Sequence, residues 1–340
     1  MPKSVFYQVS SLILSLLFIG GVILLAKASP VMVLSQLIRG AVGTPDQLAR
    51  VLATLAPLML CASGLIFTFT AGLYNLGVEG QIIAGAIGTT LALRIFQGVL
   101  PPPMVILLGI GAGAIGGLIW GLLAGALNVY GRINEIFAGL GLNFMAQGLA
   151  LYLIFGPWQR PGVASMSGTE LFDQSLWLGT WGKTEASPIS LLIALLVVIG
   201  TILTLRATSF GLQLRAVGQN SRAAYLLGIP SLQRLLSAFA ICGMCAGMAG
   251  SLQVLAIFHR LIPSISSNLG FLALLVVMLI NFNPLLIGPV AFFFSALNIG
   301  SLQLPLSLDL ESSLAGIIQG TLVLFALLGQ GIGQRMTNNQ

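Results

Sequence analysis

Ten long apolar runs, separated by short polar segments, constrain this chain more than any other feature. Each run approaches the roughly 20 residues that an α-helix needs to cross about 30 Å of hydrocarbon. Only 6% of the residues are charged and 57% are hydrophobic, so the chain has too little charge to cover a water-facing surface. The sequence therefore predicts an all-α polytopic membrane protein with one transmembrane domain over residues 1–340. The predicted spans are 9–28, 48–70, 78–96, 103–128, 134–156, 188–206, 231–257, 268–283, 284–302 and 311–330.

The basic residues bear on the orientation of the chain in the membrane. The first run follows Lys3 and ends near Ala-Lys-Ala, as a signal peptide does, but it is longer than the usual 7–15 or so apolar residues, and we expect an uncleaved helix. The bases divide evenly between the two sides, so the positive-inside rule does not decide the orientation by itself. A basic cluster at 206–234 favours a cytoplasmic place for its own loop. We therefore expect both termini in the cytoplasm.

The longest polar segment, 157–187, then forms an external loop. It contains Trp158, Trp177 and Trp181, and tryptophan concentrates at the membrane–water interface. The net charge of +6 is small for 340 residues and is otherwise scattered. We expect contact with membrane lipid and none with nucleic acid.

Motifs for enzymatic chemistry are incomplete. Residues 182–184 read Gly-Lys-Thr, but Trp177 stands where a nucleotide-binding loop needs its first glycine. Cys242 and Cys245 lie in an apolar run with no second pair or nearby histidine, so helix packing explains them better than a metal or redox site. His259 is the single histidine, and no nucleophile–base pair is evident. We expect no catalytic residue, metal or cofactor.

Glycines at four-residue spacing predict close helix packing. Small residues on one face let helix backbones approach where no hydrophobic effect drives association. The span at 103–128 carries five such glycines and the span at 231–257 carries two: Gly109, Gly113, Gly117, Gly121, Gly125, Gly243 and Gly247.

Polar residues inside the apolar segments are candidates for a translocation path. Tyr74, Asn75, Glu79 and Gln81 fall in a glycine-rich interruption before the short span at 78–96. Interrupted helices expose backbone and polar side chains to cargo in transporters. Glu79 is therefore a functional candidate, and the alternative is a cytoplasmic turn in which it caps a helix start.

Two further places show the same kind of polar residue. Asn143 and Gln147 share one face of the span at 134–156, where they either join helices or line a polar path. Asn268-Leu-Gly repeats the sequence Asn75-Leu-Gly in the opposite half of the chain, as an inverted repeat would.

The basic cluster contains the signals of a short helix. Four arginines fall within residues 206–234 without an acid, and Gly211 is expected to break the chain after the sixth span. Asn220 or Ser221 provides a cap, and Gly228 ends the helix. Ala223, Ala224 and Leu227 would share one face that fits a partner's groove. The alternative is an amphipathic segment lying on anionic headgroups.

These segments resemble a known family. Residues 73–81 are similar to "FNIGxEGQ", residues 210–229 to "GxxLRAVGxNPxAAxxxGI" and residues 242–250 to "SGxxAGxAG", motifs of the permease subunits of bacterial ABC importers for simple sugars and nucleosides. The resemblance covers about residues 64–330. Ser221 replaces the usual proline, and 268–281 departs from the family's glycine-rich block.

The resemblance implies that residues 207–230 form a cytoplasmic coupling loop. Its helix at 220–228 would dock on a separate ABC ATPase subunit, and the partners would include a second permease subunit and a periplasmic or lipid-anchored solute-binding protein. The cargo would be a nucleoside or a related simple sugar. An ion-coupled secondary transporter using Glu79 is the alternative. The coupling residues implied are Arg215, Asn220, Ser221, Arg222, Ala223, Ala224 and Gly228.

Overall fold

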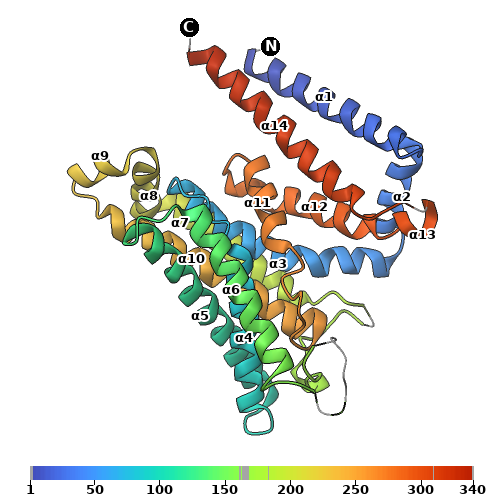
Figure 1. Cartoon of the computed structure of the whole chain (residues 1–340), viewed down its shortest axis with the longest axis vertical. Helices are drawn as coiled ribbons and strands as arrows, with labels where there is room; N and C mark the ends of the chain where they lie inside the picture. Colours follow the sequence, from blue (N-terminus) through green and yellow to red (C-terminus); the bar gives the residue numbers. More distant parts are fainter. Residues whose placement is uncertain (1–2, 161, 163–167, 183, 309, 339–340) are drawn as a thin grey trace.

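The computed structural model describes residues 3–160, 162, 168–182, 184–308 and 310–338, and the regular elements in them are all helical (Figure 1). Every predicted span coincides with a helix because a long apolar run satisfies its backbone within itself. These helices are α1 Lys3–Leu25, α3 Pro45–Thr70, α4 Val78–Phe96, α5 Pro102–Val129, α6 Glu135–Phe155, α7 Pro188–Ala207, α10 Ser231–Leu252, α11 Leu269–Leu279, α12 Ile287–Ser301 and α14 Leu314–Asn338.

Not every helix is long enough to cross a membrane. Among the described residues, six helices are long and apolar enough, or seven if α1 and the helix after it count as one bent span. That next helix, α2 Pro30–Val42, was not predicted, and the two meet at 99°. Val33 and Leu37, four residues apart on α2, are buried, so its packing and not its length stabilises it.

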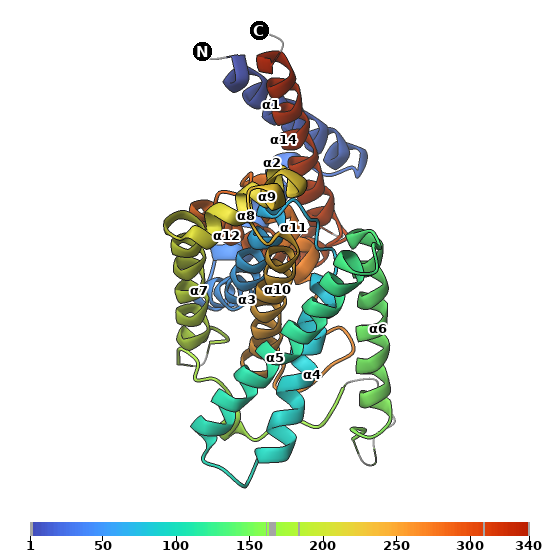
Figure 2. The same ribbon diagram turned by 90° about the vertical axis from the view of Figure 1, so that its left-hand side faces the viewer.

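The core lies around α3 and α10. In the most apolar 18-residue stretch of α3, 83% of the residues are buried, and in the span that begins with α10 72% are buried. In each of α5, α6 and α7 the corresponding share is 28%. Figure 2 shows α3 and α10 between α7 on one side and the pair α4 and α5 on the other. The outer helices therefore turn most of their apolar surface toward lipid.

The glycine spacing has its predicted packing role. The five glycines of α5 at four-residue spacing are buried, and a Cβ atom added at Gly117 would collide with the backbone of Gly243 and Gly247 in α10. The same face of α10 packs on α4, where a Cβ atom at Gly85 would also collide with Gly247. These three helices approach at backbone distance because no side chain stands between them.

The seventh span ends irregularly. After α10 the chain widens into a π-helix, η2 Gln253–Phe258, and His259 follows with a left-handed φ of 54°. The long loop, helical only at η1 Gln174–Leu176 among its described residues, packs against this end. Thr169, Phe172 and Leu178 donate backbone hydrogen bonds to Leu261, His259 and Leu255 at 2.9, 3.0 and 3.0 Å. Lys183, of the Gly-Lys-Thr sequence, lies outside the described residues.

The expected break at Gly211 is wrong. Gly211 lies inside α8 Ser209–Gln219, whose first turn is capped by the Thr208 hydroxyl, which accepts from the Gly211 amide at 3.3 Å. The break after the sixth span therefore comes earlier, between the end of α7 at Ala207 and the cap of α8 at Thr208. Gly211 is small because it packs against the backbone of Thr204 and Leu205 at the end of α7. The helix α9 Ser221–Leu226 follows as predicted, and α13 Leu304–Leu308 precedes α14.

Candidate functional site

Two helix starts from opposite halves of the chain meet at Glu79. The Glu79 carboxylate, in the first turn of α4, accepts a hydrogen bond from the backbone amide of Phe271 at 3.0 Å. The Gly270 amide and the Ser266 side chain interact with the same carboxylate. Glu79 is only 4% exposed. The acid thus neutralises the positive end of α11, where amides have no helical partner.

The repeated Asn-Leu-Gly sequences lie at this meeting point. Gly270 packs so closely that a Cβ atom there would be 2.8 Å from the side chain of Val78 and 3.0 Å from the Glu79 amide nitrogen. Glu79 lies in the first turn of its own helix, α4, and its carboxylate also accepts from an amide at the start of α11. The contact with α11 is the part of this arrangement that the sequence did not predict.

Asn75 and Gln81 form a buried amide pair beside it. Both are fully buried, and the Asn75 amide nitrogen donates to Gln81 Oε1 at 3.2 Å and to Cys242 Sγ at 3.1 Å. Asn75 Oδ1 accepts from the Gly77 amide at 3.1 Å. The turn before α4 is thereby attached to α10. Tyr74 is 45% exposed, with its ring edge-on to Phe69 at a centroid distance of 5.0 Å.

The amides of α6 bond to backbone of both interrupted segments. Asn143 donates to the Leu76 carbonyl at 2.8 Å and accepts from the Gly80 amide at 2.8 Å. Gln147 donates to the Pro263 carbonyl at 2.6 Å. Both side chains satisfy backbone groups that the interruptions leave outside regular helix.

Asn268 differs from the other predicted path residues. It is exposed, has a left-handed φ of 57° and lines a cavity of about 410 Å³ together with Asn298, Ser301 and Gln319. An adjoining cavity of about 580 Å³ shares Asn298 with it.

The second cavity holds polar residues that the sequence reasoning missed. They are Arg50, Gln253 and Asn298. A signal was present for two of them, because Gln253 and Asn298 are amide side chains within predicted spans, as Asn143 and Gln147 are. Arg50 stands near the start of a span and was treated only as an orientation charge.

Hydrogen bonds within the chain hold the segment 207–230 in place. Arg215 in α8 donates to the Leu205 carbonyl at 2.9 Å, so this arginine secures α8 to the end of α7. Asn220 caps α9 by accepting from the Ala223 amide at 2.9 Å. Gly228 follows the helix with a φ of +83°, and Ser231 donates to the Ser221 carbonyl at 2.9 Å.

The face of α9 that points outward is not the predicted one. Ala224 is 2% exposed and packs inside this chain, so it does not share an outer face with Ala223 and Leu227. The outer face carries Tyr225, Leu226 and Leu227, which are 67%, 80% and 81% exposed. Arg222, Ser221 and Ala223 are also exposed.

The end of α8, within residues 207–230, contacts the interrupted segment before α4. A Cβ atom at Gly72, whose φ is +80°, would lie 3.0 Å from the Gly218 carbonyl oxygen of α8, and one at Gly218 would collide with the Thr70 carbonyl. The end of α3 and the end of α8 therefore meet backbone to backbone. A rigid displacement of α8 would move residues 70–72.

The family of the chain follows from comparison. The family described as "Branched-chain amino acid transport system / permease component" matches residues 47–327, which include both interrupted segments and residues 207–230. The chain belongs to this permease family. It is a multi-pass membrane component of a transport system.

Relatives of the permease cover most of its length. It is 27% identical over 330 residues to a glucose ABC transporter permease protein of Haloferax volcanii, covering 94% of this chain and 86% of that one. It is 25% identical over 295 residues to a nucleoside ABC transporter permease protein of Lactococcus lactis, covering 83% and 80%. A guanosine ABC transporter permease protein of Bacillus subtilis is 24% identical over 296 residues, covering 86% and 84%.

Proposed function

We propose that the permease forms the translocation path of an ATP-binding-cassette importer for a nucleoside or a related simple sugar. The relatives named for glucose, nucleoside and guanosine transport support this class of cargo. An amino acid is the competing cargo, given the description of the family. The proposal assigns ATP hydrolysis to separate subunits.

The observation that carries the proposal is the outer face of α9. Three adjacent apolar side chains, Tyr225, Leu226 and Leu227, are each more than 65% exposed at the end of a six-residue helix. A helix this short has little stability of its own, so contacts must hold it. Aromatic and aliphatic anchors of this kind fill pockets at protein interfaces. We assign this face to docking on the ATPase.

The assignment explains how the ATPase acts on the path. Motion of α9 passes to α8 and from Gly218 to residues 70–72, which lead directly into Asn75, Glu79 and Gln81. Rigid elements that move together transmit such a displacement. In this proposal Arg215, Asn220 and Gly228 keep the loop rigid, while Arg222 and Ala223 border the docking face. The interrupted starts of α4 and α11 are the parts that open or close the path.

We also propose an orientation in which residues 207–230 face the cytoplasm. The start of α1, the end of α14 and the pair α8 and α9 lie toward one end of the molecule, and the connection between α4 and α5 lies toward the other (Figure 2). We therefore place both termini in the cytoplasm and residues 157–187 outside. A second permease subunit and an external solute-binding protein complete the proposed importer in the bacterial inner membrane.

The docking face is tested by removing two exposed leucines. The double variant L226A/L227A should bind its ATPase subunit about tenfold or more less tightly, because interface anchors contribute about 1–3 kcal/mol each. The measurement is the dissociation constant of the permease for the ATPase of its own transporter in lipid nanodiscs. L107A, at a leucine of α5 that is 69% exposed, is the matched control. Unchanged ATPase affinity of the double variant would contradict the docking assignment and favour an α9 that lies on anionic headgroups.

The source of energy separates the proposal from an ion-coupled transporter. The permease is reconstituted in vesicles with its partners, and ATP is supplied on the cytoplasmic side of the transporter. Labelled guanosine or glucose should then accumulate on that side. Collapsing proton and sodium gradients should leave uptake unchanged. Uptake that needs an ion gradient and proceeds without ATP would contradict the proposal.

A further inference from the structure

A cavity of about 580 Å³ lies where α3, η2, the start of α11 and α12 come together. Its walls combine apolar side chains such as Phe258 with a few polar ones: Arg50, Thr54, Gln253 and Asn298. Sites for small molecules have this composition, with apolar walls and a small number of placed polar groups. The adjoining cavity adds Asn268 and Gln319 around the shared Asn298.

Gln253 is the unusual residue in this cavity. It is 2% exposed, yet its Oε1 accepts no hydrogen bond from the described part of the chain. Nearly all buried amide oxygens in proteins have a donor, and an unsatisfied one costs stability. Gln253 is also the first residue of the π-helix, and single π-helical turns are frequent at functional sites because they displace side chains from the regular helical position.

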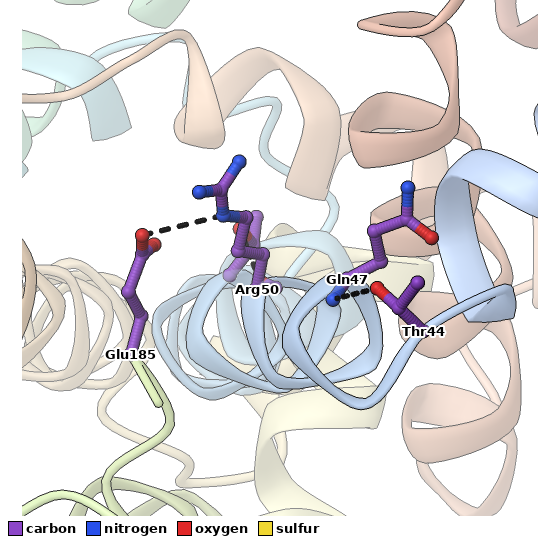
Figure 3. A network of polar contacts seen from close by, with 5 residues as sticks. Thr44, Gln47, Arg50 and Glu185 are labelled. Carbon is purple, nitrogen blue, oxygen red and sulfur yellow. Dashed lines mark hydrogen bonds and ion pairs between the residues drawn. The ribbon is translucent and has the colours of Figure 1, made fainter. Parts of the chain in front are cut away.

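The charges at the cavity are balanced. Its charged lining residues are Arg50 and Glu185, and Arg50 Nε lies 3.2 Å from Glu185 Oε1 (Figure 3). The two side chains are 52% and 58% exposed, so the ion pair stands at the opening and not deep inside. A cavity whose charges pair with each other offers no counter-charge to an ionic ligand. It suits a neutral molecule that carries hydrogen-bond donors.

We infer that Gln253 Oε1 accepts a hydrogen bond from a hydroxyl group of a neutral, polyhydroxylated cargo held in this cavity. Asn298 lies at the junction of the two cavities, where its amide can bond a second polar group of the same molecule. The inference rests on the proposed function. It adds the place where the cargo binds and the statement that the cargo is uncharged.

The test compares Q253L and Q253E in the complete transporter. Transport of guanosine, D-glucose and L-leucine is measured first with the unchanged chain, and the transported probe is then used for the variants. Q253L should raise KM for a hydroxylated probe about tenfold, which corresponds to about 1.4 kcal/mol. Because Q253L replaces an unsatisfied amide by an apolar side chain, its melting temperature should not fall. Q253E keeps an acceptor oxygen and should raise KM less than Q253L.

The matched control is Q174L, which removes an exposed amide from η1 and should leave KM unchanged. If the unchanged transporter carries a probe and Q253L has the same KM, the inference is wrong while the proposed function stands. If Q253L unfolds, Q253M repeats the test with a more flexible apolar side chain. Transport of L-leucine alone would contradict the polyhydroxylated cargo. If the unchanged transporter uses ATP to carry none of the three probes, the proposed function itself fails.

Discussion

At the scale of single residues, the polar side chains inside the spans serve mainly to complete irregular backbone. Glu79 supplies the α11 amides with an acceptor, and Asn143 supplies both a donor and an acceptor to residues 76–80. Interrupted helices survive in a membrane only where such groups satisfy the freed backbone. These residues therefore determine where the helices are interrupted. A path through the protein can open at such a place only if the interrupted backbone is satisfied in this way.

The role of Glu79 is tested by E79A and E79Q. E79A should lower the free energy of unfolding by about 1–3 kcal/mol, because buried α11 amides lose their acceptor. The Gly270 and Phe271 amides should exchange hydrogen faster in E79A. E79Q retains an acceptor oxygen and should show a smaller change in both measurements.

The same variants distinguish the ion-coupled alternative. If Glu79 carried a coupling proton, E79Q would abolish ion-dependent uptake while leaving α11 protected. Faster exchange at Gly270 in E79A with only a small change in E79Q supports the capping role. Equal exchange in all three proteins would contradict it.

At the scale of elements, the close contact of α4, α5 and α10 is the packing that the sequence predicts best. Gly113, Gly117 and Gly121 of α5 lie against Gly243 and Gly247 of α10, and their shared lack of a side chain sets the helix separation. In contrast, α11 is short and begins with an irregular segment, and its start is positioned by contacts with α4 and α6.

This packing predicts opposite effects for two alanine substitutions on one helix. G117A places a Cβ atom against the backbone of α10, which cannot move aside as a side chain can, and should destabilise the protein by about 1–3 kcal/mol. G111A has open space around it and should be neutral or stabilising, since alanine favours a helix by about 1 kcal/mol over glycine. Melting temperatures in detergent provide the comparison. Equal melting temperatures for the two variants would contradict the close packing.

At the scale of the whole molecule, the long loop joins the end of the central helix to the remainder of the permease. Trp177 stacks on His259 with ring centroids 3.8 Å apart, beside the three backbone bonds from the loop. His259 lies just beyond the span Ser231–Phe258, which ends in the π-helix that carries Gln253. The loop thus packs against the same turn that lines the cavity.

This attachment is expected to weaken in acid. Partial burial lowers the pKa of His259 below its ordinary value near 6.5. His259 therefore takes up a proton more readily when the long loop has come away from it than when the loop is packed against it. The loop's packing is most stable above about pH 6.5 and weakens as pH falls below that value. Exchange of the Phe172 amide, corrected for its intrinsic rate, should be faster at pH 5.5 than at pH 7.5. The variant H259Q should remove this difference, and a difference that persists in H259Q would show another group to be responsible.

The sequence by itself determined the helical class, the ten apolar segments, the glycine contacts and the short helix α9. Each depends on neighbouring residues: a span on the length of one apolar run, and α9 on Asn220 and Gly228 at its two ends. Packing overrode local signals at α2, which is shorter than a span, and at Gly211, where contact with α7 and the Thr208 cap continue the helix.

Only the tertiary structure decided what the polar residues do. The partner of Glu79 is 192 positions away in the chain, and Ala224 faces inward because of how α9 lies on α10. A sequence marks a polar side chain in an apolar run, since that pattern is local, but its hydrogen-bond partner comes from another helix. Gln253 shows the difference most clearly, because its unsatisfied oxygen and the cavity beside it exist only once α3, η2, the start of α11 and α12 have packed together.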